Sequence, residues 1–76
     1  MATKAFVLIE TVVGRNKQVL NELSQLEGLK SVDTVTGPYD IILVAEGERL
    51  GEIDELVTSK IQPIPGIDRT LTCLAI

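Results

Sequence analysis

The sequence contains no histidine and no tryptophan, and only one each of cysteine, tyrosine and phenylalanine among its 76 residues. Without histidine the commonest general base is missing, so we expect no enzyme and no catalytic residue. One cysteine without histidine disfavours a zinc site and excludes an internal disulfide, and we expect neither metal nor cofactor. Cys73 lies in an apolar alternation and is predicted to be a buried, inert thiol. A lone cysteine suits a reducing compartment, and we predict a cytoplasmic protein.

Positive charge is sparse as well. Seven Lys and Arg stand against eleven Asp and Glu, which gives a net charge of −4, and the basic residues are scattered along the chain. Binding to nucleic acid needs clustered Lys and Arg, so we expect no direct contact with DNA or RNA. The apolar run near the N-terminus is broken by Glu10 and is too short for a membrane span or a signal peptide. No membrane association is expected.

Four segments have the composition of strands. Residues 4–13 (KAFVLIETVV) and 40–46 (DIILVAE) are nearly continuous apolar runs, which is typical of strands buried on both faces. Residues 29–36 and 67–76 are more polar and are predicted to be strands as well. Glycine and proline separate these segments from their neighbours.

Two helices are predicted between the strands. Asn16 is a candidate N-cap for the first, and Gly28 is expected in the left-handed position that ends it. Pro63, Pro65 and Gly66 close the second helix. The apolar residues at helical spacing are Val19, Leu20, Leu23 and Leu26 in the first and Leu50, Ile53, Leu56, Val57 and Ile61 in the second.

The order strand, helix, strand, strand, helix, strand is that of the ferredoxin-like fold. We therefore predict an α+β protein with one domain over residues 1–76, a four-stranded antiparallel sheet and both helices on one face. In this βαββαβ fold the first and third strands are central, which agrees with their apolar composition. The second and fourth strands, which carry the charges and hydroxyls, are expected at the edges.

Both faces of the central strands are apolar. Phe6 and Leu8 point to one face and Val7 and Ile9 to the other, and residues 41–45 alternate in the same way. Helices can cover only one face, and soluble monomers rarely expose a large apolar surface. We predict at least a dimer, formed by packing sheet against sheet. In the last strand one face is predicted to carry Ile67, Leu71, Cys73 and Ala75, and the other Asp68, Thr70, Thr72, Leu74 and Ile76.

The segment TGPYD, residues 36–40, has two interpretations. The simpler one, favoured by residue properties alone, is a hairpin turn in which Asp40 caps its own backbone. The other is a small-ligand site. Gly37 would permit close approach to its N–H, Tyr39 would form a wall, and the Asp40 carboxylate would pair with an ammonium group.

Thr70 and Thr72 present two hydroxyls on one face of the last strand. The simpler explanation is that threonine is common in strands. Taken as ligand groups, the hydroxyls and the TGPYD turn together suit a zwitterionic amino acid, because they offer donors for its carboxylate and an acceptor for its amine.

Three stretches carry a family resemblance: AFVLIETVVG, VDTVTGPYDIILVAE and LVTSKIQPIPGIDRTLTCLAI. The sequence resembles the effector-binding domain of the leucine-responsive regulatory protein/AsnC (Lrp/AsnC) family of prokaryotes, also called the RAM domain. The resemblance covers essentially the whole chain. The TGPYD turn and the IPGIDRTLT segment are its most specific parts.

The resemblance implies dimers formed through the sheets and rings of four or five dimers, that is, an octamer or a decamer. It also implies an amino-acid effector bound between neighbouring dimers, near a Gly-x-Tyr-Asp turn and a Thr-x-Thr strand. Carried over to this sequence, the ligand-binding candidates are Thr36, Gly37, Tyr39, Asp40, Thr70 and Thr72.

Full-length members begin with a helix-turn-helix DNA-binding domain, whereas this sequence starts at the first strand and resembles stand-alone members. The favoured hypothesis is an amino-acid-sensing oligomer that regulates transcription or metabolism through a partner. One alternative is an interaction module that forms mixed oligomers with full-length Lrp/AsnC regulators. Another is a small dimeric α+β-barrel enzyme, which the missing histidine disfavours.

Overall fold

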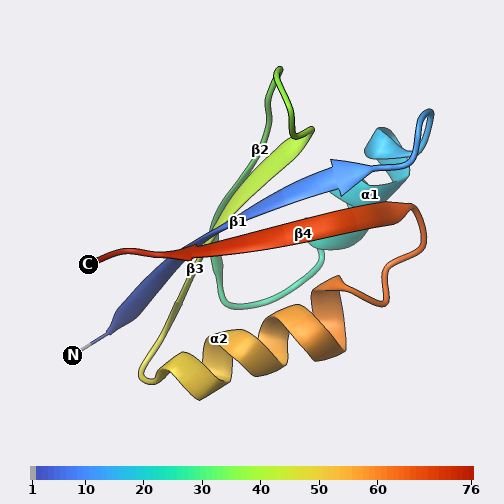
Figure 1. Ribbon diagram of the computed structural model, residues 1–76. Coiled ribbons are helices and arrows are strands. Elements are labelled where there is room, and N and C mark those ends of the chain that lie inside the picture. The colour runs from blue at the N-terminus through green and yellow to red at the C-terminus, as the bar shows by residue number, and fades with distance from the viewer. Residues whose placement is uncertain (1) are drawn as a thin grey trace.

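The computed structural model describes residues 2–76 and contains a four-stranded antiparallel sheet with two helices (Figure 1). The predicted ferredoxin-like α+β fold is confirmed, and each predicted strand lies within a few residues of its expected bounds. In chain order the elements are β1 (Thr3–Thr11), α1 (Asn16–Leu23), β2 (Leu29–Thr34), β3 (Ile41–Gly47), α2 (Leu50–Leu56), the π-helical turn η1 (Val57–Ile61) and β4 (Ile67–Leu74).

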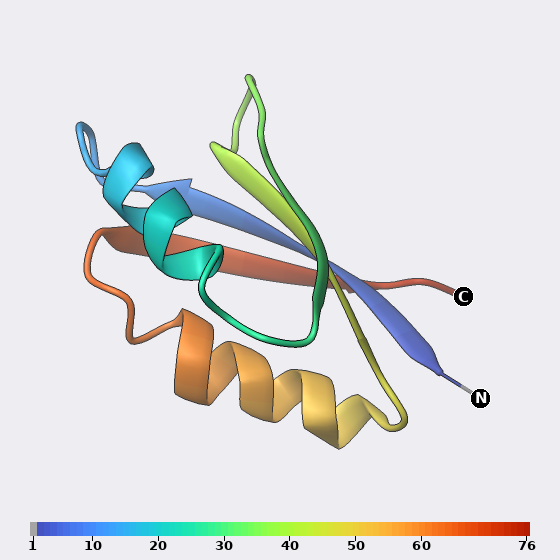
Figure 2. The same cartoon turned by 180° about the vertical axis from the view of Figure 1, so that it is seen from behind.

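The strand order across the sheet is β2-β3-β1-β4. The two apolar strands are therefore central and the two polar ones are at the edges, as predicted. Val7 marks the register, because it lies opposite Leu43 of β3 and Thr72 of β4. The two chain ends lie at the same end of the sheet, away from α1 (Figures 1 and 2).

The core lies between the helices and one face of the sheet. Figure 2 shows both helices on the near side of the strands. Burial of each large apolar side chain there stabilises the fold by about 1.5–3 kcal/mol. No helix within residues 2–76 is long and apolar enough to cross a membrane. The buried residues are Ala5, Val7, Ile9, Val19, Leu23, Ile41, Leu43, Ala45, Ile53, Val57 and Ile61.

The opposite surface of the sheet, here called the open face, is also apolar. Its apolar side chains are Phe6, Leu8, Ile42, Val44, Leu71 and Cys73, which alternate with the buried residues of their strands. The first four are half-buried, and Leu71 and Cys73 are exposed. The predicted apolar character of both faces is confirmed. The prediction that Cys73 is buried is wrong for the single chain, because no helix or strand of residues 2–76 covers the open face.

Helix α1 is shorter than its apolar pattern predicts. It begins at Asn16, so that Arg15 holds the N-cap position and makes no side-chain capping bond. Asn16 Oδ1 accepts a hydrogen bond only from Lys17 N–H, the next residue, at 3.0 Å. The helix ends at Leu23, because the N–H groups of Gln25 and Leu26 donate to carbonyls three residues back. This tighter turn lets Leu26 pack against the core.

Gly28 has a positive φ of 89°, as expected, but lies in the loop before β2. Its predicted place at the helix end is therefore wrong. The prediction that Asn16 is the N-cap is also wrong, because Arg15 holds that position.

Strand β4 contains an irregularity that the sequence does not reveal. Glu10 of β1 lies opposite Arg69, but Thr11 lies opposite Ile67, so Asp68 is an extra residue in β4. Such a bulge reverses the facing of the residues beyond it. Ile67 accordingly packs against the core, and its predicted place beside Leu71 on the open face is wrong.

Gly66 joins the η1–β4 connection to α1. Its φ is 101°, and a β-carbon at this position would lie 3.0 Å from both Cβ of Arg15 and Cγ2 of Val19. The Gly66 carbonyl accepts a hydrogen bond from Val12 N–H at 2.8 Å. The start of β4 is thus held against α1 and the end of β1 by a residue without a side chain.

Candidate functional site

The β2–β3 loop meets the end of β1 at one end of the sheet, where it projects beyond the strands (Figure 1). Val35 N–H donates to the Asp40 carbonyl at 2.9 Å, which closes the loop. Asp40 N–H donates to the Ile9 carbonyl at 2.9 Å and extends the β1–β3 pairing by one residue. Both backbone groups of Asp40 are therefore fixed by the sheet.

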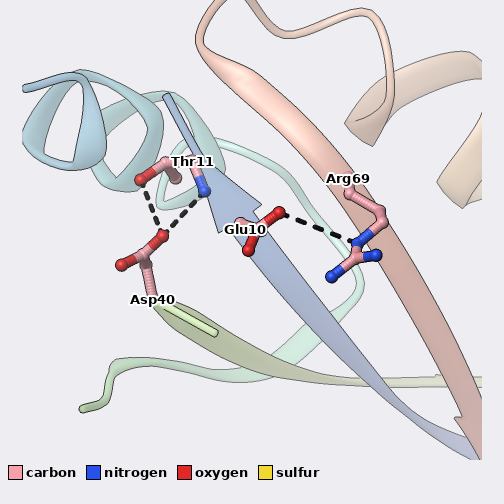
Figure 3. Close-up of polar contacts among 4 residues, drawn as sticks. All are labelled: Glu10, Thr11, Asp40 and Arg69. Atoms are coloured by element: carbon pink, nitrogen blue, oxygen red, sulfur yellow. Dashed lines mark hydrogen bonds and ion pairs between the residues drawn. The ribbon is translucent and has the colours of Figure 1, made fainter. Parts of the chain in front are cut away.

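The Asp40 side chain binds Thr11 rather than its own loop. Its Oδ2 atom accepts hydrogen bonds from Thr11 N–H at 2.8 Å and from Thr11 Oγ1 at 3.1 Å (Figure 3). The prediction that Asp40 caps its own backbone is wrong, because Thr11 lies 29 residues earlier. The other carboxylate oxygen, Oδ1, accepts no hydrogen bond from residues 2–76. One acceptor of Asp40 thus belongs to the fold and one is free.

Asp40 lines an open hollow of about 750 Å³ between the β2–β3 loop and the end of β1. Three carboxylates border it and no lysine or arginine of residues 2–76 does, so the hollow favours a cationic group. Its volume is large enough for a small metabolite. The lining residues are Glu10, Thr11, Val12, Val13, Gly14, Asn16, Gly37, Pro38, Asp40 and Asp68.

Gly37 and Thr36 are exposed in the loop. Gly37 has a φ of 131°, and no atom of the described residues lies within 4 Å of the position that a β-carbon would occupy. Glycine is required here by backbone conformation and not by crowding. The surface above it is open to a ligand or to another subunit.

Tyr39 lies at the border of the open face. The guanidinium of Arg69 stands 5.8 Å from its ring centroid, within cation–π range. Nε of Arg69 also lies 3.7 Å from Oε1 of Glu10, its cross-strand neighbour (Figure 3). The Arg69 side chain is 64% exposed, so water and salt screen this ion pair and it contributes little to stability.

Thr70 and Thr72 share one face of β4, as predicted, but it is the face that carries the helices. They lie opposite Ile9 and Val7, whose side chains are buried in the core. Gln62 Nε2 donates to Thr70 Oγ1 at 3.3 Å. Since Tyr39 lies beside Arg69 and Glu10, the sheet separates these two threonines from it.

Of the six candidates, the structure brings Gly37 and Asp40 together on one hollow. Thr36, Tyr39 and the pair Thr70 and Thr72 are not among the residues that line it in the single chain. A common ligand role for all six therefore stays a prediction. The sequence reasoning missed Thr11 and the acidic wall formed by Glu10 and Asp68, although Glu10-Thr11 is the first polar pair after the apolar run and could have signalled the end of the strand.

Comparison with known proteins decides the family. Residues 4–76 match the family described as the Lrp/AsnC ligand binding domain. The chain belongs to this family. The Lrp/AsnC domain is the ligand-binding part of transcriptional regulators and not an enzyme, so the enzyme alternative is excluded.

The relatives agree with this assignment. An uncharacterised HTH-type transcriptional regulator of Pyrococcus furiosus is 28% identical in an alignment that covers 99% of this chain and 52% of the regulator. The chain thus spans about half the length of the curated relatives it matches. The crystal structure of FFRP-DM1 is 34% identical with a TM-score of 0.90 and covers 97% of this chain and 99% of its own. A Thermus thermophilus protein of known structure is 34% identical with a TM-score of 0.91, and the match covers 97% and 92% of the two chains.

Proposed function

We propose that this Lrp/AsnC domain is a cytoplasmic amino-acid sensor that works as an oligomer and regulates transcription through a partner. The family description supports a small-molecule effector, and the relatives named as transcriptional regulators support the regulatory role. A regulator of the same fold from Neisseria meningitidis, 13% identical with a TM-score of 0.87, has been solved as a complex with L-Met. That likeness is one of fold.

The free oxygen of Asp40 at the hollow is the observation that carries the proposal. An α-ammonium group has three N–H donors, and a carboxylate oxygen is a strong, charge-assisted acceptor for one of them. Glu10 and Asp68 add negative charge to the same hollow. Ammonium recognition is therefore the chemistry that this surface supports best.

The effector's carboxylate needs donors that the hollow of one chain lacks. No lysine or arginine of the described residues lines it, and Thr70 and Thr72 are not among its lining residues. We propose that a neighbouring copy supplies such donors, with these two threonines as candidates. The effector would then bind between subunits, as the family resemblance implies.

The open face supports the oligomer. Six apolar side chains on one sheet surface are suited to contact with the same surface of a second copy. Two-fold symmetry makes such a contact self-complementary. We propose this dimer as the unit from which an octamer or decamer is built.

The test is calorimetric titration of the oligomer with each of the twenty amino acids. We expect at least one to bind, and Asp40→Asn to weaken its binding about 30-fold, because truncating a buried charge pair costs about 2 kcal/mol or more. Asp54→Asn, an exposed carboxylate on α2, is the matched control and should bind like the wild type. If no amino acid binds, or if Asp40→Asn binds normally, the proposal is wrong.

A second function, mixed assembly with longer Lrp/AsnC regulators, is favoured by the apolar open face and by the match to half the length of such proteins. Its test is native mass spectrometry after co-expression with a full-length regulator of the same host. A stable mixed oligomer supports this function, and complete self-sorting contradicts it.

A further inference from the structure

The end of β1 lacks a backbone partner that the sheet would normally supply. The β1–β3 pairing ends at Ile9 and Ile41, and the backbone groups of Asp40 are already bonded to Ile9 and Val35. Thr11 N–H lies beyond them and would have no acceptor on β3. The Asp40 carboxylate takes the place of the missing carbonyl, because its Oδ2 atom accepts a hydrogen bond from Thr11 N–H at 2.8 Å.

The Thr11 hydroxyl adds a second donor to the same oxygen, at 3.1 Å. A carboxylate oxygen has two lone-pair sites, so Thr11 occupies both sites of Oδ2. Figure 3 shows the second oxygen of Asp40 pointing away from Thr11. One threonine therefore fixes which oxygen of Asp40 is bonded within the fold and which is left free.

We propose that Thr11 is a positioning residue for Asp40 and that its hydroxyl holds the carboxylate so that Oδ1 receives the effector's ammonium group in a fixed orientation. This role rests on the proposed function, because it requires that Asp40 binds an ammonium. The terminal torsion of aspartate is broad and roughly two-fold, so a carboxylate held by one hydrogen bond turns more freely. Effector binding would then have to order it, which lowers affinity.

Three substitutions distinguish the contribution of the Thr11 hydroxyl to binding from the contributions of the Thr11 backbone N–H and of strand β1 as a whole. Thr11→Val keeps the shape and the backbone N–H but removes the hydroxyl, and Thr11→Ser restores the hydroxyl. Thr3→Val is the matched control, because Thr3 lies at the other end of β1 and its hydroxyl has no hydrogen bond to the part of the chain that the structure describes. Urea unfolding of each variant confirms that the fold is retained.

The readout is the Kd of the assembled protein for each of the twenty amino acids, measured by calorimetry. We expect Thr11→Val to raise the Kd of a bound amino acid about 3- to 10-fold. This is less than the roughly 12-fold or more that a lost hydrogen bond to a charged group costs directly, because Thr11 acts on the effector only through Asp40. Thr11→Ser and Thr3→Val should bind like the wild type. In the Asp40→Asn background Thr11→Val should change Kd less than about two-fold, since the two residues act as one unit.

The outcomes separate this inference from the proposed function. If the wild type binds no amino acid, the proposed function is overturned and the role of Thr11 with it. If the wild type binds and Asp40→Asn weakens binding, but Thr11→Val does not, only the role of Thr11 is overturned. A loss in Thr11→Val that persists in full beside Asp40→Asn also overturns it, because a general effect on the strand would act without Asp40.

Discussion

Replacing Gly66 by alanine tests how closely β4 is held against α1. Two costs add at this position. A left-handed backbone costs a non-glycine residue about 1–2 kcal/mol. The new methyl group would stand 3.0 Å from carbons of Arg15 and Val19, inside the 3.5–4.0 Å of normal carbon contact. Overpacking of this kind costs about 1–3 kcal/mol, so we expect a total loss of about 2–5 kcal/mol in unfolding free energy.

Substitutions at two other glycines measure the backbone cost separately from the overpacking cost. Gly28 has a φ of 89°, but no atom of the described residues lies within 4 Å of the point where a β-carbon would stand. Gly28→Ala should therefore show the backbone cost alone, about 1–2 kcal/mol. Gly51 is helical and unobstructed, and Gly51→Ala should be neutral or stabilising by up to about 1 kcal/mol.

The assay is urea unfolding of all three variants at one protein concentration, because assembly makes stability depend on concentration. The packing argument is refuted if Gly66→Ala and Gly28→Ala lose the same free energy within about 0.5 kcal/mol, the usual limit of such differences.

Two further substitutions test the core and the open face. Leu43→Ala should lower the unfolding free energy by about 2–5 kcal/mol in the same assay, because Leu43 is completely buried between the sheet and the helices; a loss below about 1 kcal/mol would contradict this packing. Leu71→Asp should convert the oligomer to monomers in light scattering, because it would bury an unpaired charge between two sheets. Leu50→Asp on α2 is the control: both leucines are 47% exposed in the single chain, and equal behaviour of the two variants would refute the sheet-to-sheet dimer.

The fold could be predicted well from the sequence, because every second side chain of β1 and β3 is buried in the core and the side chains between them face the other side of the sheet. Ala5, Val7 and Ile9 enter the core, and Phe6 and Leu8 lie on the open face, as their alternation required. Features that depend on backbone geometry at the ends of elements were less accessible. The alternation of apolar and polar residues in β4 gives no sign that Asp68 is an extra residue. The spacing of the leucines in α1 does not show where hydrogen bonds to the carbonyl three residues back replace the α-helical bonds to the carbonyl four residues back.

The site was predicted in part. The TGPYD turn was identified, but its simplest interpretation assigned Asp40 to the wrong partner. Local turn chemistry considers neighbours in sequence, whereas Thr11 reaches Asp40 only through the pairing of β1 with β3. For the same reason, paired hydroxyls at residues 70 and 72 suggested a site beside the turn, although the register turns them to the helix side of the sheet.

The position of the chain ends limits how the hollow can communicate with anything joined to this domain. Both ends leave the sheet at the end where β1 begins and β4 finishes (Figures 1 and 2). Thr11 is the last residue of β1, and the length of that strand separates it from Thr3 by roughly 25 Å at about 3.3 Å per residue. That span exceeds the Debye length of about 8 Å at physiological salt. The charge of a ligand bound at Asp40 would therefore be screened before it reached a segment attached at either end. Control of such a segment within one chain would have to pass through packing or through subunit assembly.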